Sequence, residues 1–158
     1  EVHEARSRPG DEGIRLGCSM SPTPTEWAYI AGLFDGEGSV CAGMTHRRVY
    51  VELTSTTEPV IDWFMLMVGG YKFKGKAKPP RKDYWKWWLN GRDALARFRD
   101  GIMPFSIIKA PHLILLGKYL PTLAEPRRRP TEEQLQRRLR IMTDLRSINV
   151  RGRRPESA

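Results

Sequence analysis

The stretch Ala28–Val40, AYIAGLFDGEGSV, begins as an amphipathic helix and ends at a corner where two glycines enclose an acidic residue. Small residues recur at every fourth position, at Ala28, Gly32 and Gly36, so one side of the helix carries no bulk. A glycine inside a soluble helix costs about 1 kcal/mol relative to alanine, so this ridge predicts close contact with another helix. If that helix belongs to a second copy of the chain, a two-fold axis brings the two Glu37 side chains together.

The two Glu37 carboxylates that such an axis brings together, each two residues after an Asp35, predict a binding site for a divalent cation at this acidic corner. Two adjacent carboxylates repel one another unless a cation lies between them, and hard ions such as Mg²⁺ prefer oxygen ligands. Such an ion can activate a water molecule and stabilise the leaving oxygen of a phosphodiester. The alternative interpretation is that Gly36 and Gly38 simply end a helix and that Glu37 is a solvated turn residue.

The 158 residues carry a formal net charge of +9, and the basic residues are concentrated in two segments. Residues 46–92 hold ten Lys or Arg against four acidic residues, and residues 127–154 hold ten Arg against three. This distribution favours a nucleic-acid partner, whereas the alternative is a solvated basic surface. With 40% hydrophobic residues, the chain can fill a core and does not have the composition of a disordered protein.

The remaining composition indicates a protein of a reducing compartment. Cys18 and Cys41 form no CxxC pair, and the three histidines are too scattered for a zinc site. No apolar run has the length of a membrane span, and the N-terminal residues lack the apolar core of a signal peptide. We therefore expect no membrane partner and an intracellular location, in the cytoplasm of a bacterium or phage-infected cell or in an organelle.

The hydrophobic periodicity predicts an α+β fold with four strands in one mostly antiparallel sheet. Thr25 is the expected N-cap of the first helix, which runs to about Asp35, and Gly101 is the expected end of the helix that starts at Gly91. The other expected helices cover residues 56–68, 110–120 and 131–148, and the expected strands cover residues 38–45, 48–55, 71–78 and 83–90. We expect a flexible tail over residues 1–22, a domain over 23–124, and a basic linker, C-terminal helix and tail over 125–158.

Alternation in the strands predicts an exposed polar face of the sheet. The side chains expected there are Arg48, Tyr50, Glu52, Thr54, Lys72, Lys74 and Lys76, with Lys86 and Trp88 opposite the inward-facing Trp85 and Trp87. A two-stranded ribbon fits the major groove of DNA, where long side chains can read base edges. The alternative is an ordinary solvated face whose lysines protect edge strands.

Residues 30–38, IAGLFDGEG, resemble the motif of the LAGLIDADG homing endonucleases. The positions that match outright are Ala31, Gly32, Leu33, Asp35 and Gly38, and Glu37 stands at the second acidic position of the motif. The resemblance covers about residues 24–152, since it includes an αββαββα order, the GRDAL helix, the MPFSIIK segment and the LRSINVRG ending.

The resemblance implies a homodimer that cuts both strands of a long, near-palindromic DNA duplex, because the chain carries one copy of the motif. It implies that Glu37 and Gly36 bind catalytic Mg²⁺, with Mn²⁺ as a substitute and Ca²⁺ as a non-productive ion. It also implies that Asp35 supports the end of the motif, that Lys109 lies near the scissile phosphate, and that Ser55 positions a water. A lysine at the expected start of a helix, as at Lys109, is unfavourable unless an anion lies nearby.

The expected DNA contacts follow from the sheet face and the tip of its first hairpin. They are Ser39, Cys41, His46, Arg47, Arg48, Tyr50, Glu52, Thr54, Lys72, Lys74, Lys76 and Lys86. The expected dimer contacts are Ala28, Gly32, Leu33 and Gly36, and we expect no small-molecule substrate. The alternatives of the same fold are a DNA-binding regulator that does not cut and an intron-splicing maturase that binds RNA. A third is a basic protein that coats nucleic acid without sequence preference.

Overall fold

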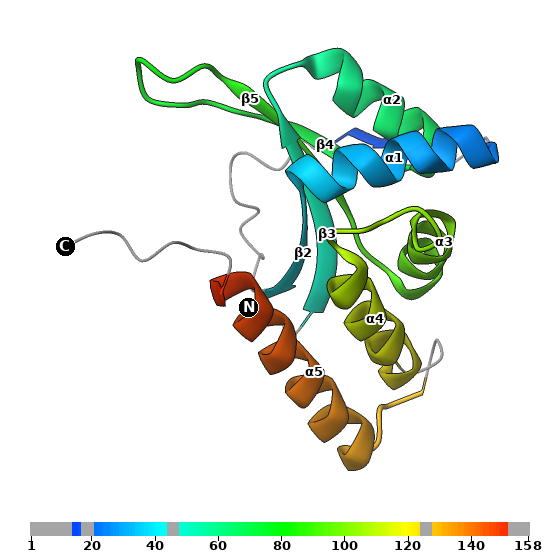
Figure 1. Cartoon of the computed structure of the whole chain (residues 1–158). Coiled ribbons are helices and arrows are strands. Elements are labelled where there is room, and N and C mark those ends of the chain that lie inside the picture. Colours follow the sequence, from blue (N-terminus) through cyan, green and yellow to red (C-terminus); the bar gives the residue numbers. More distant parts are fainter. Residues whose placement is uncertain (1–13, 17–20, 44–47, 124–127, 152–158) are drawn as a thin grey trace, which may run out of the picture.

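The computed structural model describes residues 14–16, 21–43, 48–123 and 128–151, and Figure 1 shows their arrangement. The strands are β1 (Ile14–Leu16), β2 (Gly38–Gly43), β3 (Arg48–Ser55), β4 (Gly70–Gly75) and β5 (Tyr84–Leu89). The helices are α1 (Pro24–Glu37), α2 (Glu58–Val68), α3 (Arg92–Ile102), α4 (Ala110–Tyr119), the short 3₁₀ helix η1 (Leu120–Thr122) and α5 (Glu132–Arg151). The α+β class and the αββαββα order with an added C-terminal helix are confirmed.

The strands form one antiparallel sheet in the order β1-β4-β5-β3-β2. Four of them are the strands that the sequence predicts. The fifth, β1, comes from the segment expected to be a flexible tail: Ile14 pairs with Lys72 and Leu16 pairs with Gly70. That expectation is wrong for these three residues, because β4 offers an edge whose backbone groups can accept another strand.

The first helix begins and ends at different residues from those expected. Thr23, not Thr25, is the N-cap: its Oγ1 accepts a hydrogen bond from the Glu26 amide at 3.3 Å, and Glu26 Oε2 accepts one from the Thr23 amide at 2.7 Å. This capping box satisfies two amides of the first turn, in which Pro24 has no N–H that needs an acceptor. The helix then continues past Asp35 to Glu37. A Cβ on the following residue, Gly38, would lie 2.2 Å from the Phe34 ring, so only glycine lets β2 leave the helix this closely.

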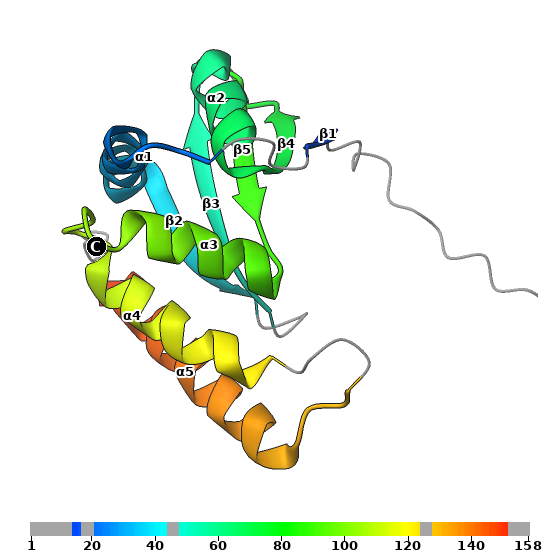
Figure 2. The same cartoon turned by 90° about the vertical axis from the view of Figure 1, so that its right-hand side faces the viewer.

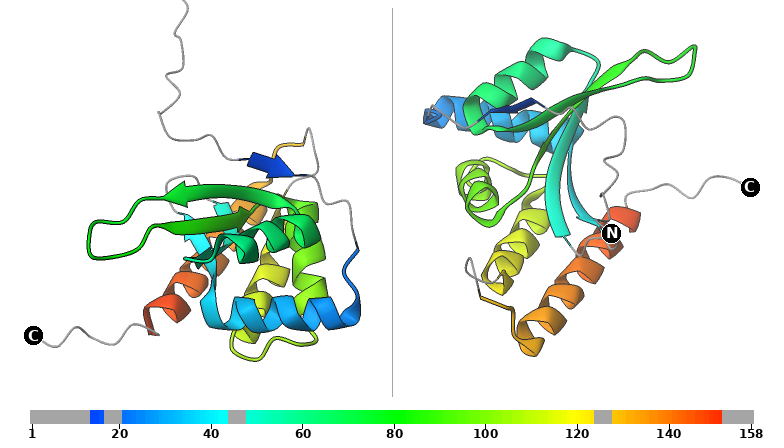
Figure 3. Two further views of the ribbon diagram at one scale, coloured as in Figure 1. Left: turned by 90° about the horizontal axis from the view of Figure 1, so that it is seen from above. Right: turned by 180° about the vertical axis from the view of Figure 1, so that it is seen from behind.

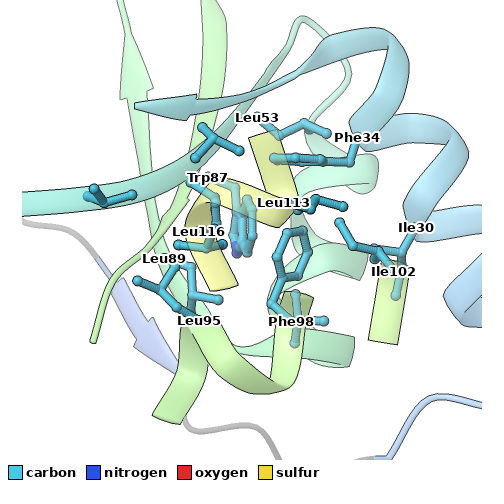
Figure 4. Close-up of a cluster of buried hydrophobic side chains, with 14 of the residues drawn as sticks. Ile30, Phe34, Leu53, Trp87, Leu89, Leu95, Phe98, Ile102, Leu113 and Leu116 are labelled. Atoms are coloured by element: carbon cyan, nitrogen blue, oxygen red, sulfur yellow. The ribbon is translucent and has the colours of Figure 1, made fainter. Parts of the chain in front are cut away.

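The core lies between one face of the sheet and the helices. Figures 1 and 2 show α1, α2 and α3 on the same side of the sheet, with α4 and α5 farther along it, near β2. Figure 4 shows how Trp87 of β5 is surrounded by side chains from α1, α3 and α4. Trp87 is fully buried, packs edge-on against Phe64 at 5.1 Å between ring centroids, and donates a 2.7 Å hydrogen bond to the Gly69 carbonyl. The inward placement predicted for this tryptophan is confirmed.

The prediction that Gly101 ends α3 is wrong, because the helix continues to Ile102. A Cβ at Gly101 would lie 2.4 Å from the indole of Trp27, so this glycine makes room for the tryptophan of α1. The same function is served by Gly117 in α4, where a Cβ would lie 2.6 Å from the Arg99 side chain. Arg99 passes through that gap to donate a 2.9 Å hydrogen bond to the Leu113 carbonyl. Both glycines therefore set how closely the helices pack.

The C-terminal helix α5 lies along α4 and reaches the edge strand β2 (Figure 3). Its buried side chains are Ile141, Met142 and Leu145, in agreement with the predicted amphipathic pattern. Figures 1 and 3 also show the β4–β5 hairpin projecting beyond the helices. Within the described ranges, none of the helices combines the length and the apolar character needed to cross a membrane.

Candidate functional site: the acidic corner and the open sheet face

Asp35, in the last turn of α1, accepts four hydrogen bonds from the segment that leads into α4. The donors are the Ser106 hydroxyl at 2.5 Å and the amides of Ile107, Ile108 and Lys109 at 2.7, 3.0 and 3.0 Å. The carboxylate thus occupies the N-terminal end of α4, where amides lack helical partners and the helix dipole favours an anion. This contact joins residues 71 to 74 positions apart.

The hydrogen bonds keep Asp35 ionised. Burial raises the pKa of this carboxyl, but the Ser106 hydroxyl and the three amides outweigh burial, so that the pKa is lowered overall. Each carboxylate oxygen accepts two of the four hydrogen bonds, which suits Asp35 to positioning rather than to metal ligation. Asp35 was expected to support the end of its own helix, α1, but its hydrogen bonds come from the residues that start α4.

Glu37 is the exposed last residue of α1. The last turn of this helix contains no basic residue, and the negative end of a helix dipole disfavours a carboxylate by about 0.3–1 kcal/mol. The charge of Asp35 is balanced by the positive end of α4, whereas Glu37 lies at the negative end of α1. A cation is favoured at such a position, and the Gly36 carbonyl offers a second oxygen there. Across the described ranges, no group of three or more His, Cys, Asp or Glu side chains could hold a metal ion.

The contacts of Asp35 bring Lys109 to the corner. Lys109 is the N-cap residue of α4, and its amide donates a hydrogen bond to Asp35 Oδ1. Since Asp35 precedes Glu37 by two residues, this bond places the backbone of Lys109 near the corner. An anion was expected beside this lysine, and the structure supplies one in the Asp35 carboxylate. The dipole of α4 therefore does not by itself call for a phosphate at this point.

Ser55 lies at the end of β3. Gly38 pairs with Leu53, two residues earlier, so Ser55 is at the same end of the sheet as the acidic corner. It pairs with Trp85 on the helix-covered face, and its Oγ accepts a 3.0 Å hydrogen bond from the Thr57 amide. That bond helps to start α2 and leaves the hydroxyl hydrogen available to another acceptor.

The face of the sheet opposite the core carries most of the expected DNA contacts, and Figure 1 shows no helix over it among the described ranges. We call this surface the open sheet face. The register aligns Glu52 with Ser39 and Trp88, Tyr50 with Cys41, and Thr54 with Lys86. The residues of the open sheet face are Ser39, Cys41, Arg48, Tyr50, Glu52, Thr54, Tyr71, Phe73, Lys86 and Trp88.

The expectation that Lys72 and Lys74 share this face is wrong. They pair with Trp87 and Trp85, so they point to the helix-covered side. The side chain of Lys72 is only 12% exposed, and its Nζ lies 2.8 Å from Glu58 Oε1 of α2 and also forms an ion pair with Asp62. The alternation in YKFKGKAK is correct, but the acidic side chains of α2 select the side to which the lysines point.

The other expected DNA contacts are Lys76, His46 and Arg47. Lys76 is exposed in the hairpin between β4 and β5, beyond the last residue of β4. Lys74, on the helix-covered side, has its Nζ 3.9 Å from Asp83 Oδ2 in the same hairpin. His46 and Arg47 lie outside the described residues.

The open sheet face carries one ion pair and two ionisable groups whose pKa values are raised. Lys86 Nζ lies 3.0 Å from Glu52 Oε2, with side chains 26% and 23% exposed. Burial, followed by the charge of Glu52, raises the pKa of Cys41 to about 11. Burial, followed by the interaction with Cys41, raises the pKa of Tyr50 to about 12. The thiol and the phenol are therefore neutral at pH 7.

The glycine ridge of α1 points away from the core. A Cβ on Gly32 or Gly36 would meet no atom within 4 Å, and both glycines are exposed. Ala28 and Leu33 are half-buried beside them, and Tyr29 is 56% exposed. The close helix contact that the sequence predicts for this ridge is therefore not made within the described part of the chain.

A second long-range contact, which the sequence does not predict, joins α5 to β2 and α4. Asn149 of α5 donates from Nδ2 to the Val40 carbonyl at 3.0 Å, and its Oδ1 lies 3.1 Å from His112 Nε2. Because Oδ1 only accepts, His112 carries its hydrogen on Nε2. Asn149 thereby joins β2, three residues after Glu37, to α4, three residues after Lys109. Polar residues at single positions, such as Ser106 and Asn149, leave no periodic signal in the sequence.

Comparisons with known proteins agree with this geometry. The LAGLIDADG-like domain model matches residues 24–103. The archaeal intron-encoded homing endonuclease I-Vdi141I, solved in complex with DNA, superposes with a TM-score of 0.63 at 13% identity, over 84% of this chain and 89% of that one. The homing endonuclease I-CvuI, solved with its target in the presence of 2 mM Ca, gives a TM-score of 0.60 at 12% identity, over 85% and 87% of the two chains.

A third solved structure, the homing endonuclease I-TnaI, gives a TM-score of 0.52 at 16% identity, over 85% of this chain and 100% of that one. No protein with a curated description matches the sequence. The family model covers the motif helix, the sheet and α3, and the solved structures share the fold over most of the chain. This chain belongs to the family of LAGLIDADG-like domains, and it has the fold of the homing endonucleases I-Vdi141I and I-CvuI.

Proposed function

We propose that the protein is a site-specific DNA endonuclease that acts as a homodimer and cuts both strands of a long, near-palindromic target. The observation that carries this proposal is the exposed Glu37 at the negative end of α1, beside a neighbour, Asp35, whose charge is already balanced by α4. A structural role alone gives no reason for an acidic residue at that end of a helix.

The open sheet face is the surface proposed to bind the target. It bears Arg48 and Lys86 beside polar and aromatic side chains that alternate along the strands, as a major-groove reader requires. Glu52 can accept from cytosine N4 once it leaves its ion pair with Lys86. I-Vdi141I and I-CvuI, which have the same fold, were solved in complex with DNA.

The donor set at the corner fits a hard divalent cation. The Glu37 carboxylate and the Gly36 carbonyl would hold Mg²⁺, which Mn²⁺ replaces productively and Ca²⁺ does not. Bound there, the ion would supply an activated water and stabilise the leaving oxygen. The ammonium of Lys109 would balance charge that develops on the scissile phosphate, and the second lone pair of Ser55 Oγ would accept a hydrogen bond from the attacking water and so position it. Asp35 acts as a positioning residue through the Lys109 amide.

The glycine ridge is the proposed dimer contact. Gly32 and Gly36 allow a second α1 helix to approach closely, with Ala28 and Leu33 beside them. A two-fold axis along this contact brings two Glu37 residues together, one for each DNA strand, and makes the preferred target near-palindromic.

The test is cleavage of a randomised duplex library in Mg²⁺, in Mn²⁺ and in Ca²⁺, with the cut ends sequenced. We expect cuts at one near-palindromic sequence in Mg²⁺ and Mn²⁺, none in Ca²⁺, and none from Glu37→Gln in any ion. Glu133→Gln, at an exposed acidic position of α5, is the matched control and should cut like the unchanged protein.

Two results would contradict the proposal. Selective binding of the library without cleavage in any ion would make the protein a DNA-binding regulator. Structured RNA that competes better than duplex DNA at matched salt would instead identify a maturase.

A further inference from the structure

The open sheet face contains a hollow of about 360 Å³ whose lining includes three aromatic side chains. Tyr50 comes from β3, Phe73 from β4 and Trp88 from β5. Side chains on a surface that reads DNA are usually polar, because most groups on base edges are hydrogen-bond donors or acceptors. An aromatic hollow in such a surface is therefore suited to bind an apolar group of the DNA.

The aromatic rings are held in place by one another. Trp88 stacks on Tyr71, its direct partner across the strands, with 4.7 Å between ring centroids and 24° between ring planes. Tyr50 meets Trp88 nearly perpendicularly, at 6.5 Å and 81°. Phe73 lies under the ammonium of Lys86, 5.9 Å from its ring centroid. Since one face of the Trp88 indole is already covered, the hollow is better suited to receive a small apolar group than to intercalate a base.

Two charged side chains of the lining are paired with one another. Lys86 and Glu52, both in the lining, form an ion pair with 3.0 Å between Nζ and Oε2. Tyr50 has a neutral phenol because its pKa is raised to about 12, first by burial and then by its neighbours Cys41 and Glu52. Arg48 and Asn90 of the lining can meet polar groups of the DNA, whereas the three aromatic rings give the hollow a largely apolar surface.

We propose that this hollow binds the 5-methyl group of thymine in the major groove, so that each half of the target requires a T·A pair at the position facing Trp88. The thymine methyl is the apolar feature of the major groove. The volume exceeds that of a methyl group, so the base edge that carries the methyl enters with it. Arg48, exposed in the lining, lies where a positive charge can meet the neighbouring phosphate or a guanine. The inference rests on the proposed function, because it assumes that the open sheet face binds duplex DNA.

The experiment removes only the methyl group. A randomised duplex library is prepared once with thymidine and once with deoxyuridine, and the protein selects sequences from each by binding in Ca²⁺. Burying one methyl group raises affinity about fourfold, so a symmetric site with two such contacts should bind about 15-fold more tightly with thymine than with uracil. We expect an invariant T·A pair in each half of the thymidine-selected target. The dissociation constant should be about 15-fold larger when those two thymines are replaced by deoxyuridine.

Variants assign the effect to the hollow. Trp88→Ala and Phe73→Ala should bind thymine and deoxyuridine targets equally, whereas Asp93→Ala, at an exposed position of α3 outside the lining, should keep the preference. Trp88→Phe provides a second variant if Trp88→Ala does not fold, as judged by circular dichroism, and should retain only part of the preference.

The outcomes separate this inference from the function on which it depends. If no sequence is selected from either library, the proposed function fails. If a target is selected and cut but binds equally well with thymine and uracil, the function stands and the methyl-binding hollow is overturned. Tighter binding to single strands than to duplex would also overturn it, since base stacking on Trp88 would then be the mode of binding.

Discussion

Asp35 lies within the motif to which we assign the proposed catalytic chemistry, yet its four hydrogen bonds hold the start of α4 in place. Replacing it with alanine leaves three amides and one hydroxyl without their acceptor. Hydrogen bonds to a charged group are worth about 1.5–3 kcal/mol, so Asp35→Ala should lower the free energy of unfolding by about 2 kcal/mol. Urea denaturation measures this change. Asp93→Ala, at an exposed position of α3, is the control and should stay within about 0.5 kcal/mol of the unchanged protein.

The same carboxylate should make stability depend on acid. Its pKa is lower in the folded chain than in the unfolded one, so the unfolded chain binds more protons as the pH falls. The stabilisation is fully present above the unfolded pKa, about 3.9, and is lost as the pH falls through the folded pKa. The stability advantage over Asp35→Asn should thus be constant from pH 7 to 5 and decrease below pH 4. A constant difference down to the lowest pH at which the protein folds would contradict the lowered pKa.

Cys41, on the open sheet face, should react slowly with alkylating reagents. Its thiol has a pKa of about 11, whereas a free cysteine has about 8.5, so at pH 8 the thiolate fraction is about 240-fold smaller. In a Cys18→Ser background, iodoacetamide should alkylate Cys41 at pH 8 at least 100-fold more slowly than it alkylates the urea-unfolded chain. Bound DNA should not be needed for this protection. Alkylation at the rate of the unfolded chain would show that Glu52 and burial do not suppress the thiolate.

Among the elements, α5 has a role that its basic composition does not reveal. Through Asn149 it holds the β2 edge and the start of α4, the two segments that follow Glu37 and Lys109. Because Asn149 is itself exposed, Asn149→Ala should cost only about 1 kcal/mol of unfolding free energy in thermal or urea unfolding.

Cleavage rate distinguishes a positioning role of Asn149 from simple stabilisation. In the fully folded variant at low temperature, we expect the cleavage rate to fall while affinity for the target is kept. Ser147→Ala, exposed on the same helix, should change neither quantity. Equal rates for the two variants would show that α5 does not position the corner.

At the level of elements, the sequence predicts the order of helices and strands, the motif helix and the inward tryptophan correctly, because these depend on periodicity over many residues. It does not predict the face to which Lys72 points, because alternation gives a period and not a direction. The direction is set by Glu58 and Asp62, which only the packing of α2 brings near. The three residues of β1 are too few to show a period, and their pairing depends on the β4 edge.

The candidate site was predictable to the same degree. Asp35, Glu37 and Lys109 stand out by motif, and the structure brings their segments together. Their connection through Ser106 was not predictable, since a single serine 71 residues away has no pattern. The same reason hides the aromatic character of the open sheet face, because Tyr71 and Phe73 join Tyr50 and Trp88 only through strand register.

For the whole molecule, the glycine ridge allows the proposed dimer contact to be tested without disturbing the fold of one chain. A side chain at Gly32 meets nothing in its own chain, and leucine is a better helix former than glycine. Gly32→Leu should therefore fold with equal or higher stability, by up to about 1 kcal/mol. It should sediment as a monomer, whereas we expect the unchanged protein to sediment as a dimer. It should also lose cleavage of both strands. A Gly32→Leu dimer of unchanged affinity in analytical ultracentrifugation would remove the ridge from the interface.

The contact between Asp35 and the segment before α4 also has a consequence during synthesis of the protein. A ribosome translates the motif helix early, but the donors for Asp35 come 71 to 74 residues later, and Asn149 is translated later still. A nascent chain that ends before Ser106 has its acidic corner without the segment that carries Lys109. For the double-strand cleavage that we propose, this order of translation withholds the assembled corner until the ribosome has passed Asn149.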